Sequence, residues 1–329
     1  MSAPAGPVEV SVVVPVKNRR DLLRRTLAAL DAQTFRDFEV LVVDDGSTDG
    51  ADEEAAATAV AGRPVRLLRN EGAGAVAGRQ TGVRSSTAAF LAFTDSDCEP
   101  DPGWLATAVE HLRGEAHLAY GRTMPARPVG PLERSVNEAD GGLFPTCNLA
   151  VRRDTYDAVG GFDGAAGDRW GFRPSNRAQG LGFGEDTLFG WAVARTHPVS
   201  YDERMLVRHH VFPSDFREWL GRSWQVAAFP AIVREVPELR RTMVRHGVLF
   251  THRSRVPLYA TLGAIATRQP VMIGAGLAWW VTHRFRHTLR HAPVPIPKRF
   301  TALPAQLVLD VVHAAALVTG SVRARTLLL

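Results

Sequence analysis

Cysteine is scarce in this chain of 329 residues, in which only Cys98 and Cys147 are present. Two cysteines are too few for a disulfide framework, and they lack metal-ligand spacing. The sequence therefore excludes a disulfide-stabilised scaffold, and a reduced, cytoplasmic setting is the simplest expectation. The N-terminus has no basic segment followed by an apolar core, so we expect no secretory signal.

Acidic side chains are almost absent from the last part of the chain. Residues 239–329 contain 13 Lys and Arg but a single acid, Asp310, which gives a net charge of +12. Residues 1–238 contain 26 Lys and Arg against 33 Asp and Glu, which gives a net charge of −7. This division indicates an anionic partner for the basic part; nucleic acid, an anionic membrane surface and a phosphorylated ligand are the alternatives.

Uninterrupted apolar runs are short, whereas a membrane-spanning helix needs about 18 to 20 apolar residues. Residues 271–281 are eleven uncharged residues, and Asp310 and His313 interrupt the run at 303–320. We therefore expect no clean span. The basic flank at 283–291 and the nearby tryptophans suit helices that lie at an anionic membrane face. A helical cap packed on the catalytic domain is the alternative.

Strand-like and helix-like segments alternate along the N-terminal part. Residues 8–16 are β-branched and almost continuously apolar, as in a strand buried on both faces. Asp21 is the expected N-cap of a helix at 21–33. Further strands are predicted at 38–45, 64–70 and 88–97, a further helix at 50–62, and another helix from the glycine-rich residues 70–82. The alternation predicts an α/β fold with a mostly parallel central sheet and helices on both faces.

Polar residues gather where the predicted strands end. The carboxyl ends of parallel strands lie at one edge of a sheet, and functional residues collect beyond that edge. The residues at these ends are Pro15, Lys17 and Asn18, then Asp44 and Asp45, and finally Asp95 and Asp97. The sequence thus predicts a site crowded with carboxylates.

The stretch NEGAGAVAGRQTG, residues 70–82, is similar to the glycine-rich turn of a dinucleotide-binding fold, with Asp95 in the place of its ribose-binding acid. That interpretation predicts an NAD(P)-binding oxidoreductase. However, such a turn follows the first strand, where this chain has PVKNRRDLL without a glycine. Carboxylates after two strands would also repel a pyrophosphate unless Mg²⁺ or Mn²⁺ lies between them. Asp95 and Asp97 are expected to point to the same side of an extended chain, as metal ligands would.

Six segments resemble, in this order, the motifs of family 2 glycosyltransferases with the GT-A fold. They are SVVVPVKNR (11–19), VLVVDDGSTDG (40–50), GAVAGRQTGV (74–83), FTDSDCEPDPGWL (93–105), PTCNLAVRRDTYDAVGGFD (145–163) and GFGEDTLFGWAVAR (182–195). Each motif is loose, but the ordered set is specific, and it covers roughly residues 8–225.

The resemblance implies a GT-A type catalytic domain at 1–238, with a nucleotide-sugar half at about 1–120 and an acceptor half at about 121–238. A basic, helical appendage follows at 239–329. The implied activity is the metal-dependent transfer of a sugar from a nucleotide-diphosphate sugar to an acceptor hydroxyl, with inversion at the anomeric carbon. Synthesis of a cell-envelope polysaccharide or a glycolipid is a setting for such a reaction.

The resemblance also implies which residues contact the nucleotide. Pro15, Lys17 and Asn18 match the loop that contacts the base and the ribose. Asp44 and Asp45 match the pair of which one recognises the base, and a turn residue is the alternative interpretation of Asp45.

Further matches concern the diphosphate and the metal. Arg79 matches the arginine that approaches the nucleotide or its diphosphate. Asp95 and Asp97 match the D-x-D motif, in which Asp97 would bind Mg²⁺ or Mn²⁺ and Asp95 would hold the ribose or metal-bound water. Either His209 or His210, but not both, would complete the metal site or contact the diphosphate, because neighbouring strand residues point to opposite sides. An exposed loop histidine without such a role is the alternative.

Glu185 and Asp186 match the acid pair that begins an acceptor-side helix. Asp186 is the expected general base for the acceptor hydroxyl, and Glu185 is the alternative or a contact to the sugar or acceptor. In isolation, such a pair is typical of compensation of the helix dipole.

The acceptor is not identified, and a lipid-linked acceptor would explain a basic region in peripheral contact with the inner face of the cell membrane. A nucleic-acid partner is not expected, because no binding motif is present and the larger domain is acidic. A non-catalytic protein that binds a nucleotide sugar or a membrane is the remaining alternative.

Overall fold

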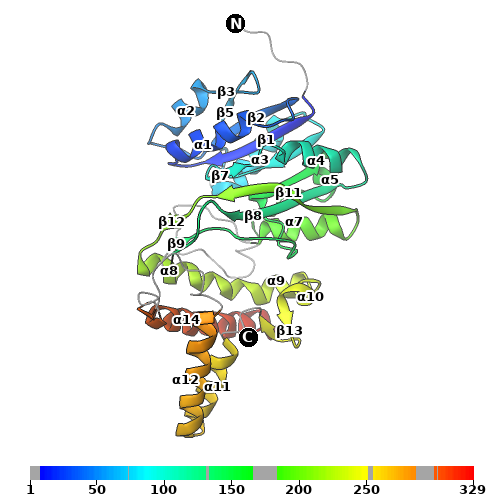
Figure 1. The fold of residues 1–329 in the computed structure, drawn as a ribbon. Coiled ribbons are helices and arrows are strands. Elements are labelled where there is room, and N and C mark those ends of the chain that lie inside the picture. The colour runs from blue at the N-terminus through cyan, green and yellow to red at the C-terminus, as the bar shows by residue number, and fades with distance from the viewer. Residues whose placement is uncertain are drawn as a thin grey trace. The chain divides into compact units, whose positions relative to one another are not determined.

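The structure is a computed structural model that describes residues 8–72, 74–130, 133–165, 184–250, 255–286, 300–301 and 303–329. Residues 182–183 of the last motif and 287–291 of the basic flank lie outside the described residues. The chain divides into two compact units, which Figure 1 shows as a ribbon. The first consists of Met1–Ala126 and Ser135–His210, and the second of Arg127–Arg134 and Val211–Leu329. The predicted domain boundary between residues 238 and 239 stays a prediction.

An eight-stranded sheet forms the centre of the first unit, in the order β5-β2-β1-β6-β10-β8-β11-β7. Its strands are β1 (Val10–Val16), β2 (Phe38–Asp44), β5 (Arg66–Arg69), β6 (Phe90–Phe93), β7 (Cys98–Pro100), β8 (Leu118–Pro125), β10 (Leu149–Arg152) and β11 (Val199–His209). The first four strands run parallel, with Val10 opposite both Phe38 and Phe90. Strand β10 is antiparallel to β6 and β8, β11 is parallel to β8, and β7 is antiparallel to β11. The sheet is therefore parallel where the sequence predicted it.

Helices cover both faces of this sheet (Figure 1). They are α1 (Arg20–Asp31), α2 (Ala51–Ala57), α3 (Gly74–Ser85), α4 (Trp104–Arg113), α5 (Arg153–Ala158) and α7 (Glu185–Ala194), together with the 3₁₀ helix η1 (Thr146–Asn148). Val10, Val12, Val14 and Val16 of β1 pack with residues of α1, α2 and α4. Val13 packs with residues of α3, α5 and α7 on the opposite face. Burial on two faces explains why the sequence of this strand is almost continuously apolar.

Helix α1 begins one residue earlier than predicted. Its N-cap residue is Arg19, which makes no side-chain cap hydrogen bond, so the prediction that Asp21 is the N-cap was wrong. Asp21 lies in the first turn instead, where a negative charge interacts favourably with the helix dipole.

Helix α2 ends at Ala57, so the prediction of a helix over 50–62 was wrong in length. Thr58 is extended, and the chain then reverses between two short paired strands, β3 (Ala59–Val60) and β4 (Arg63–Pro64). The turn residues Ala61 and Gly62 have φ values of +54° and +75°. A tight two-residue hairpin needs positive φ at both positions, and glycine adopts it without strain. The alanine-rich sequence favours a helix, but residues 59–64 form this hairpin instead.

The second unit is mainly helical. Its elements are β9 (Glu133–Arg134), β12 (Phe212–Pro213), α8 (Phe216–Ser223), η3 (Trp224–Ala228), α9 (Phe229–Glu235), α10 (Leu239–Met243), β13 (Val244–Arg245), β14 (Leu249–Phe250), α11 (Arg255–Ala266), α12 (Pro270–Arg284) and α14 (Leu303–Ala324). Helix α14 packs against η3 and α9. The approach is close, because a β-carbon on Gly320 would lie 2.1 Å from the carbonyl oxygen of Ala227.

Helices α11 and α12 form a hairpin that joins α14 at its base (Figure 1). The two helices touch where Gly276 meets Thr261, since a β-carbon on Gly276 would lie 2.3 Å from Thr261 Oγ1. Among the described residues, α14 is the one helix whose length and composition would allow it to cross a membrane. Asp310 and His313, which interrupt the apolar run in the sequence, both lie within this helix, so the expectation of no clean span stays a prediction. Its one acid, Asp310, is fully buried in an ion pair with Arg284.

Candidate functional site

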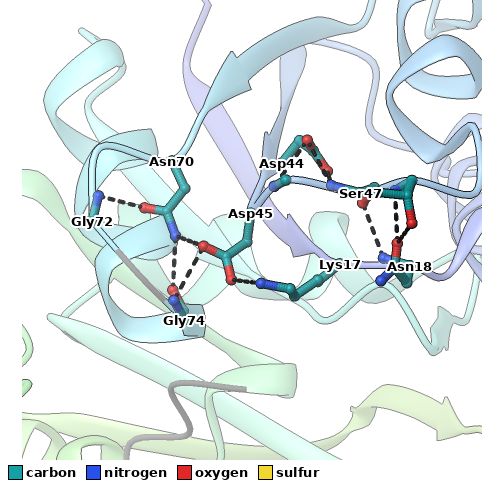
Figure 2. A network of polar contacts seen from close by, with 10 residues as sticks. Lys17, Asn18, Asp44, Asp45, Ser47, Asn70, Gly72 and Gly74 are labelled. Carbon is teal, nitrogen blue, oxygen red and sulfur yellow. Dashed lines mark hydrogen bonds and ion pairs between the residues drawn. The ribbon is translucent and has the colours of Figure 1, made fainter. Parts of the chain in front are cut away.

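The loops after β1 and β2 are tied together by polar contacts (Figure 2). Lys17 Nζ lies 3.0 Å from Asp45 Oδ2. Asn18 has a φ of +50°, and its Oδ1 accepts the N–H of Thr48 at 2.8 Å. The N–H of Asn18 donates to Ser47 Oγ at 3.0 Å. The predicted nucleotide-binding loop is therefore held in place by the loop that carries the acid pair.

Asp44 and Asp45 make different contacts (Figure 2). Asp44 is buried, and its carboxylate accepts the N–H groups of Gly46 and Ser47 at 3.1 Å. Asp45 Oδ1 accepts a hydrogen bond from Asn70 Nδ2 at 2.8 Å, while Oδ2 faces Lys17. Asp44 thus shapes the turn, and Asp45 is the member of the pair that faces the other loops of this edge.

The glycine-rich turn brings α3 close to the sheet. Gly74 begins α3 with a φ of +83°, and its N–H lies 3.3 Å from Asp45 Oδ1. A β-carbon on Gly78 would lie 3.3 Å from that of Pro15. Gly78 lets the backbone of α3 lie close to the side chain of Pro15, so the spacing of these glycines has a packing reason and does not require a dinucleotide.

Arg79 on α3 is a buried cation that joins two acidic segments. It is 4% exposed; its Nη2 donates to Asp95 Oδ1 at 2.7 Å, and its Nη1 lies 3.7 Å from Glu185 Oε1. Burial lowers the pKa of Arg79, but Asp95 and Glu185 offset this and hold the pKa above its ordinary value. The guanidinium stays charged between the D-x-D segment and the start of α7.

Glu185 and Asp186 begin α7, as the motif predicted. Glu185 is 7% exposed, and its Oε2 has no hydrogen-bond partner among the residues that the structure describes. Burial raises the pKa of Glu185, and Arg79 opposes this rise. Asp186 Oδ1 accepts the N–H of Thr187 at 2.7 Å. Burial and then the charge of Glu185 raise the pKa of Asp186 to about 7, a value suited to proton transfer at neutral pH.

Asp97, two residues after Asp95 in the chain, lies in a second group of polar side chains, together with Cys98 and His209. It is 6% exposed, its Oδ2 accepts a hydrogen bond from Arg19, and its Oδ1 lies 3.7 Å from His209 Nε2. Ligand atoms of Asp97, Cys98 and His209 lie within 4.8 Å of one another, an arrangement that could hold a metal ion. Asp95 is paired with Arg79 instead, so its role as a metal ligand stays a prediction.

Strand pairing distinguishes the two histidines. His209 lies opposite Cys98 in the antiparallel pair of β11 and β7. Its Nδ1 lies 2.7 Å from the carbonyl oxygen of His210, a contact that makes Nδ1 the donor and turns Nε2 toward Asp97. His210 contributes its backbone N–H, which donates to the carbonyl oxygen of Asp97 at 2.9 Å. His209 is therefore the histidine whose ring nitrogen reaches the cluster.

Sequence reasoning missed Arg19 and the position of Cys98. Arg19 directly follows Asn18 in the first motif, so its place in the sequence could have indicated it. Cys98 is fully buried, and burial raises the pKa of its thiol well above the ordinary value. A neutral thiol is a poor ligand for Mg²⁺ or Mn²⁺, so we interpret Cys98 as a packing residue beside Asp97.

The start of α7 is held by a preceding loop. Thr187 Oγ1 donates to the carbonyl oxygen of Leu143 at 2.8 Å, and Trp191 Nε1 donates to that of Gly142 at 2.9 Å. Phe144 has a φ of +51° and is buried against Gly190. Helix α7 and its acid pair therefore depend on close packing with this loop.

We expect Gly190→Ala to destabilise the protein, because the new β-carbon would lie 2.1 Å from Phe144 Cγ. Overpacking of this kind costs about 1–3 kcal/mol and would lower the Tm by several degrees. Thermal unfolding measures the effect. Gly103→Ala is the control, because a β-carbon there would have no atom of the described residues within 4 Å, its own chain neighbours aside. Equal Tm values for the two variants would mean that Phe144 moves aside without cost.

The fold has a counterpart among solved structures. The mannosyltransferase PcManGT from Pyrobaculum calidifontis, solved in complex with GDP-Man and Mn²⁺, aligns with 97% of this chain over 87% of its own, with a TM-score of 0.52 and 17% identity. At this identity the likeness shows the fold alone. The GT-A type fold predicted from the sequence is confirmed.

Comparison with known sequences points to the same family as the order of the motifs. Residues 11–166, just under half of the chain, match the family model described as Glycosyl transferase family 2, and this part of the chain is identified with that family. Glycosyltransferase AglE of Haloferax volcanii is 33% identical over 198 residues, which are 54% of this chain and 65% of AglE. The pre-mycofactocin glycosyltransferase of Mycobacterium tuberculosis is 27% identical over 269 residues, which are 75% of this chain and 53% of that protein. This chain thus spans between half and two thirds of these relatives.

Proposed function

We propose that the protein is an inverting, metal-dependent glycosyltransferase that moves a sugar from a nucleoside-diphosphate sugar to an acceptor hydroxyl. The observation that carries this proposal is that Arg79 joins Asp95 of the D-x-D segment to Glu185 at the start of α7. Asp97, two residues after Asp95, lies beside His209. A diphosphate, a sugar and an acceptor need these groups next to one another, in this order.

The donor is proposed to bind at the loops after β1 and β2. Pro15, Lys17 and Asn18 contact the base and the ribose, and Asp45 recognises the base from the neighbouring loop. The hydrogen bonds that join these loops support a preformed nucleotide pocket. Arg79 then offers its guanidinium to the diphosphate, for which a planar, permanently charged group is well suited.

Asp97 and His209 are the residues proposed to hold Mg²⁺ or Mn²⁺. A buried carboxylate with an imidazole oriented by a second hydrogen bond fits a divalent cation of this kind, and the relative PcManGT was solved with Mn²⁺. When bound, the ion stabilises negative charge that develops on the diphosphate leaving group. The close contact of Arg19 with Asp97 balances the charge of that carboxylate.

Asp186 is proposed to act as the general base. Its carboxylate takes the proton of the acceptor hydroxyl while the acceptor oxygen bonds to the anomeric carbon. The bond from that carbon to the diphosphate breaks, and the diphosphate leaves with the electron pair. One displacement of this kind inverts the anomeric centre. Glu185, held by Arg79, is proposed to contact the sugar or the acceptor.

The acceptor is proposed to be a hydroxyl compound that a lipid carries at the inner face of the cell membrane. The net charge of +12 over residues 239–329 supports this, because anionic lipids attract such a segment. In this proposal residues 1–238 carry out the transfer, and the basic part keeps the enzyme near its acceptor.

A screen of nucleoside-diphosphate sugars tests the proposal. We expect one donor to raise the Tm of the protein in the presence of Mn²⁺, because a ligand that binds the folded state stabilises it by mass action. NMR of the product should then show inversion at the anomeric carbon. Binding of NAD(P), together with no response to any nucleotide sugar, would favour an oxidoreductase and contradict the proposal.

A further inference from the structure

The α11–α12 hairpin has apolar side chains on its outer surface. Soluble helices usually place polar residues there and bury their apolar face. Here the positions that face inward are occupied by residues such as Thr261 and Gly276, where the two helices meet. Between residues 256 and 283 the single charged side chain is Arg268, in the turn that joins the helices.

The exposed side chains of the hairpin are large as well as apolar. Their exposed fractions are 49% for Leu262, 52% for Ile265, 82% for Val271, 59% for Met272, 43% for Leu277 and 50% for Trp279. They come from both helices, so the apolar surface surrounds the far part of the hairpin instead of forming one stripe. A surface of this kind and size on a soluble protein indicates an apolar environment that covers it.

The base of the hairpin is charged and has an excess of positive charge. Arg284 on α12 pairs with Asp310 of α14, and Trp280 Nε1 donates to the same carboxylate at 2.8 Å. Arg255, the first residue of α11, is 1% exposed, yet within the described part of the chain its Nε and both Nη atoms have no hydrogen-bond partner. One carboxylate therefore faces two buried guanidinium groups.

Among the described residues, no carboxylate makes a direct hydrogen bond to the buried guanidinium of Arg255. Its side chain contacts the ring of Phe250, with Cζ 5.7 Å from the centroid, and that contact leaves all its N–H groups unused. Buried charges are normally paired, because removal from water without a partner is costly. A phosphate group has the charge and the several acceptor oxygens that this side chain could bind.

We propose that the α11–α12 hairpin inserts its apolar surface into an anionic phospholipid bilayer, where Arg255 at its base binds a lipid phosphate. The ten residues from Pro270 to Trp279 span about 15 Å as a helix, which is about the depth of one hydrocarbon leaflet. Trp279 then lies near the level of the headgroups, where tryptophan is favoured. Oblique insertion lets the long side chain of Arg268 extend toward the headgroups.

A second copy of the chain explains these features less well. A two-copy contact would cover one side of the hairpin, whereas exposed apolar residues lie on both helices. It would also bring together two bases with the same excess of positive charge, which repel each other. A bilayer covers the whole surface and supplies the missing anions at the base.

Flotation of the full chain with vesicles tests the proposal. We expect binding to an equal mixture of phosphatidylcholine and phosphatidylglycerol, and weaker binding to phosphatidylcholine alone. The double variant Ile265→Glu/Leu277→Glu should bind the mixture roughly tenfold or more weakly, because both side chains would carry charge into the leaflet. The control is Leu67→Glu/Met124→Glu, which alters two residues of the first unit that are each 38% exposed. The control should float like the wild type.

A fluorescence measurement covers the case in which the double variant misfolds. Brominated acyl chains should quench part of the tryptophan emission of the wild type, and Trp279→Phe should remove that part. Failure of the wild type to float, unchanged flotation of the double variant, or equal quenching of Trp279→Phe would each overturn insertion. So would light scattering that shows a dimer for the wild type and a monomer for the double variant, without vesicle binding.

Arg255→Met tests the phosphate contact separately. Because it removes an unpaired buried charge, we expect a higher Tm than the wild type in lipid-free buffer, together with weaker vesicle binding. Vesicle binding equal to that of the wild type would overturn the role of Arg255. Stabilisation of the wild type by inorganic phosphate, with no flotation on vesicles, would assign Arg255 to a soluble phosphate and also overturn the proposal.

Discussion

Asp186→Asn is expected to abolish most of the turnover while leaving nucleotide binding intact. The amide keeps the shape of the carboxylate but cannot take the acceptor proton, and loss of a general base lowers kcat by about 10²- to 10⁴-fold. The donor contacts proposed at Lys17, Asn18 and Asp45 are unchanged, so the Kd of the nucleotide should stay within about twofold of the wild type. Initial rates and a nucleotide titration measure the two quantities.

The matched control is Asp154→Asn. Asp154 occupies the first turn of α5, where its Oδ1 accepts the N–H of Thr155 at 2.6 Å. Asp186 makes the same contact with Thr187 at 2.7 Å. Both variants therefore disturb the start of a helix in the same way, but only one removes the proposed base. Equal losses of activity in the two variants would assign Asp186 a structural role.

The pH dependence gives Asp186 a second signature. With a pKa of about 7, the carboxylate is protonated in acid and cannot act as a base. We therefore expect kcat to rise with pH toward about 7 and then to level off. Stability should show the opposite trend, because the raised pKa means that the folded state binds this proton more tightly than the unfolded chain does. That contribution to the free energy of unfolding is lost as the pH rises from about 4 to about 7. Asp186→Asn should remove both dependences.

The parallel half of the sheet followed from local sequence alone. The run VEVSVVVPV has a β-branched, almost continuously apolar pattern, and the structure buries β1 on both faces. Because strands in such a sheet deliver their carboxyl ends to one edge, the positions of Lys17, Asp45 and Asp95 could be predicted together. Helix α2 was less predictable, since alanine favours a helix but the turn at Ala61 and Gly62 ended it.

The individual contacts between segments that lie far apart in the sequence could not be predicted. Arg19 reaches Asp97 across 78 residues of chain. The order of the strands placed both segments at one edge of the sheet, but it did not show which side chains pair there. The choice between His209 and His210 depends on the pairing of β11 with β7, which places His209 opposite Cys98. Pairing register is set by tertiary packing, and a shift of one residue would have turned the other ring toward Asp97.

Asp97→Asn is expected to remove the support that Mn²⁺ gives to nucleotide binding. The variant keeps the size of the side chain but loses the charge that a divalent cation requires, so we expect the Mn²⁺-dependent gain in nucleoside-diphosphate affinity to fall by roughly a hundredfold. Binding measured in EDTA should be similar for the variant and the wild type. Titrations with and without Mn²⁺ measure this difference, and a gain as large as that of the wild type would exclude Asp97 as the ligand.

The two adjacent histidines supply an internal comparison for the same site. His209→Ala removes the ring whose Nε2 lies 3.7 Å from Asp97, so we expect a smaller Mn²⁺-dependent gain in affinity. His210→Ala keeps the backbone N–H that donates to the carbonyl oxygen of Asp97, so its gain should equal that of the wild type. The two substitutions lie next to each other in the chain, but only His209→Ala removes a ring that faces Asp97. If His210→Ala lost the gain and His209→Ala kept it, the metal would lie on the other side of β11, and the proposed orientation of the diphosphate would be wrong with it.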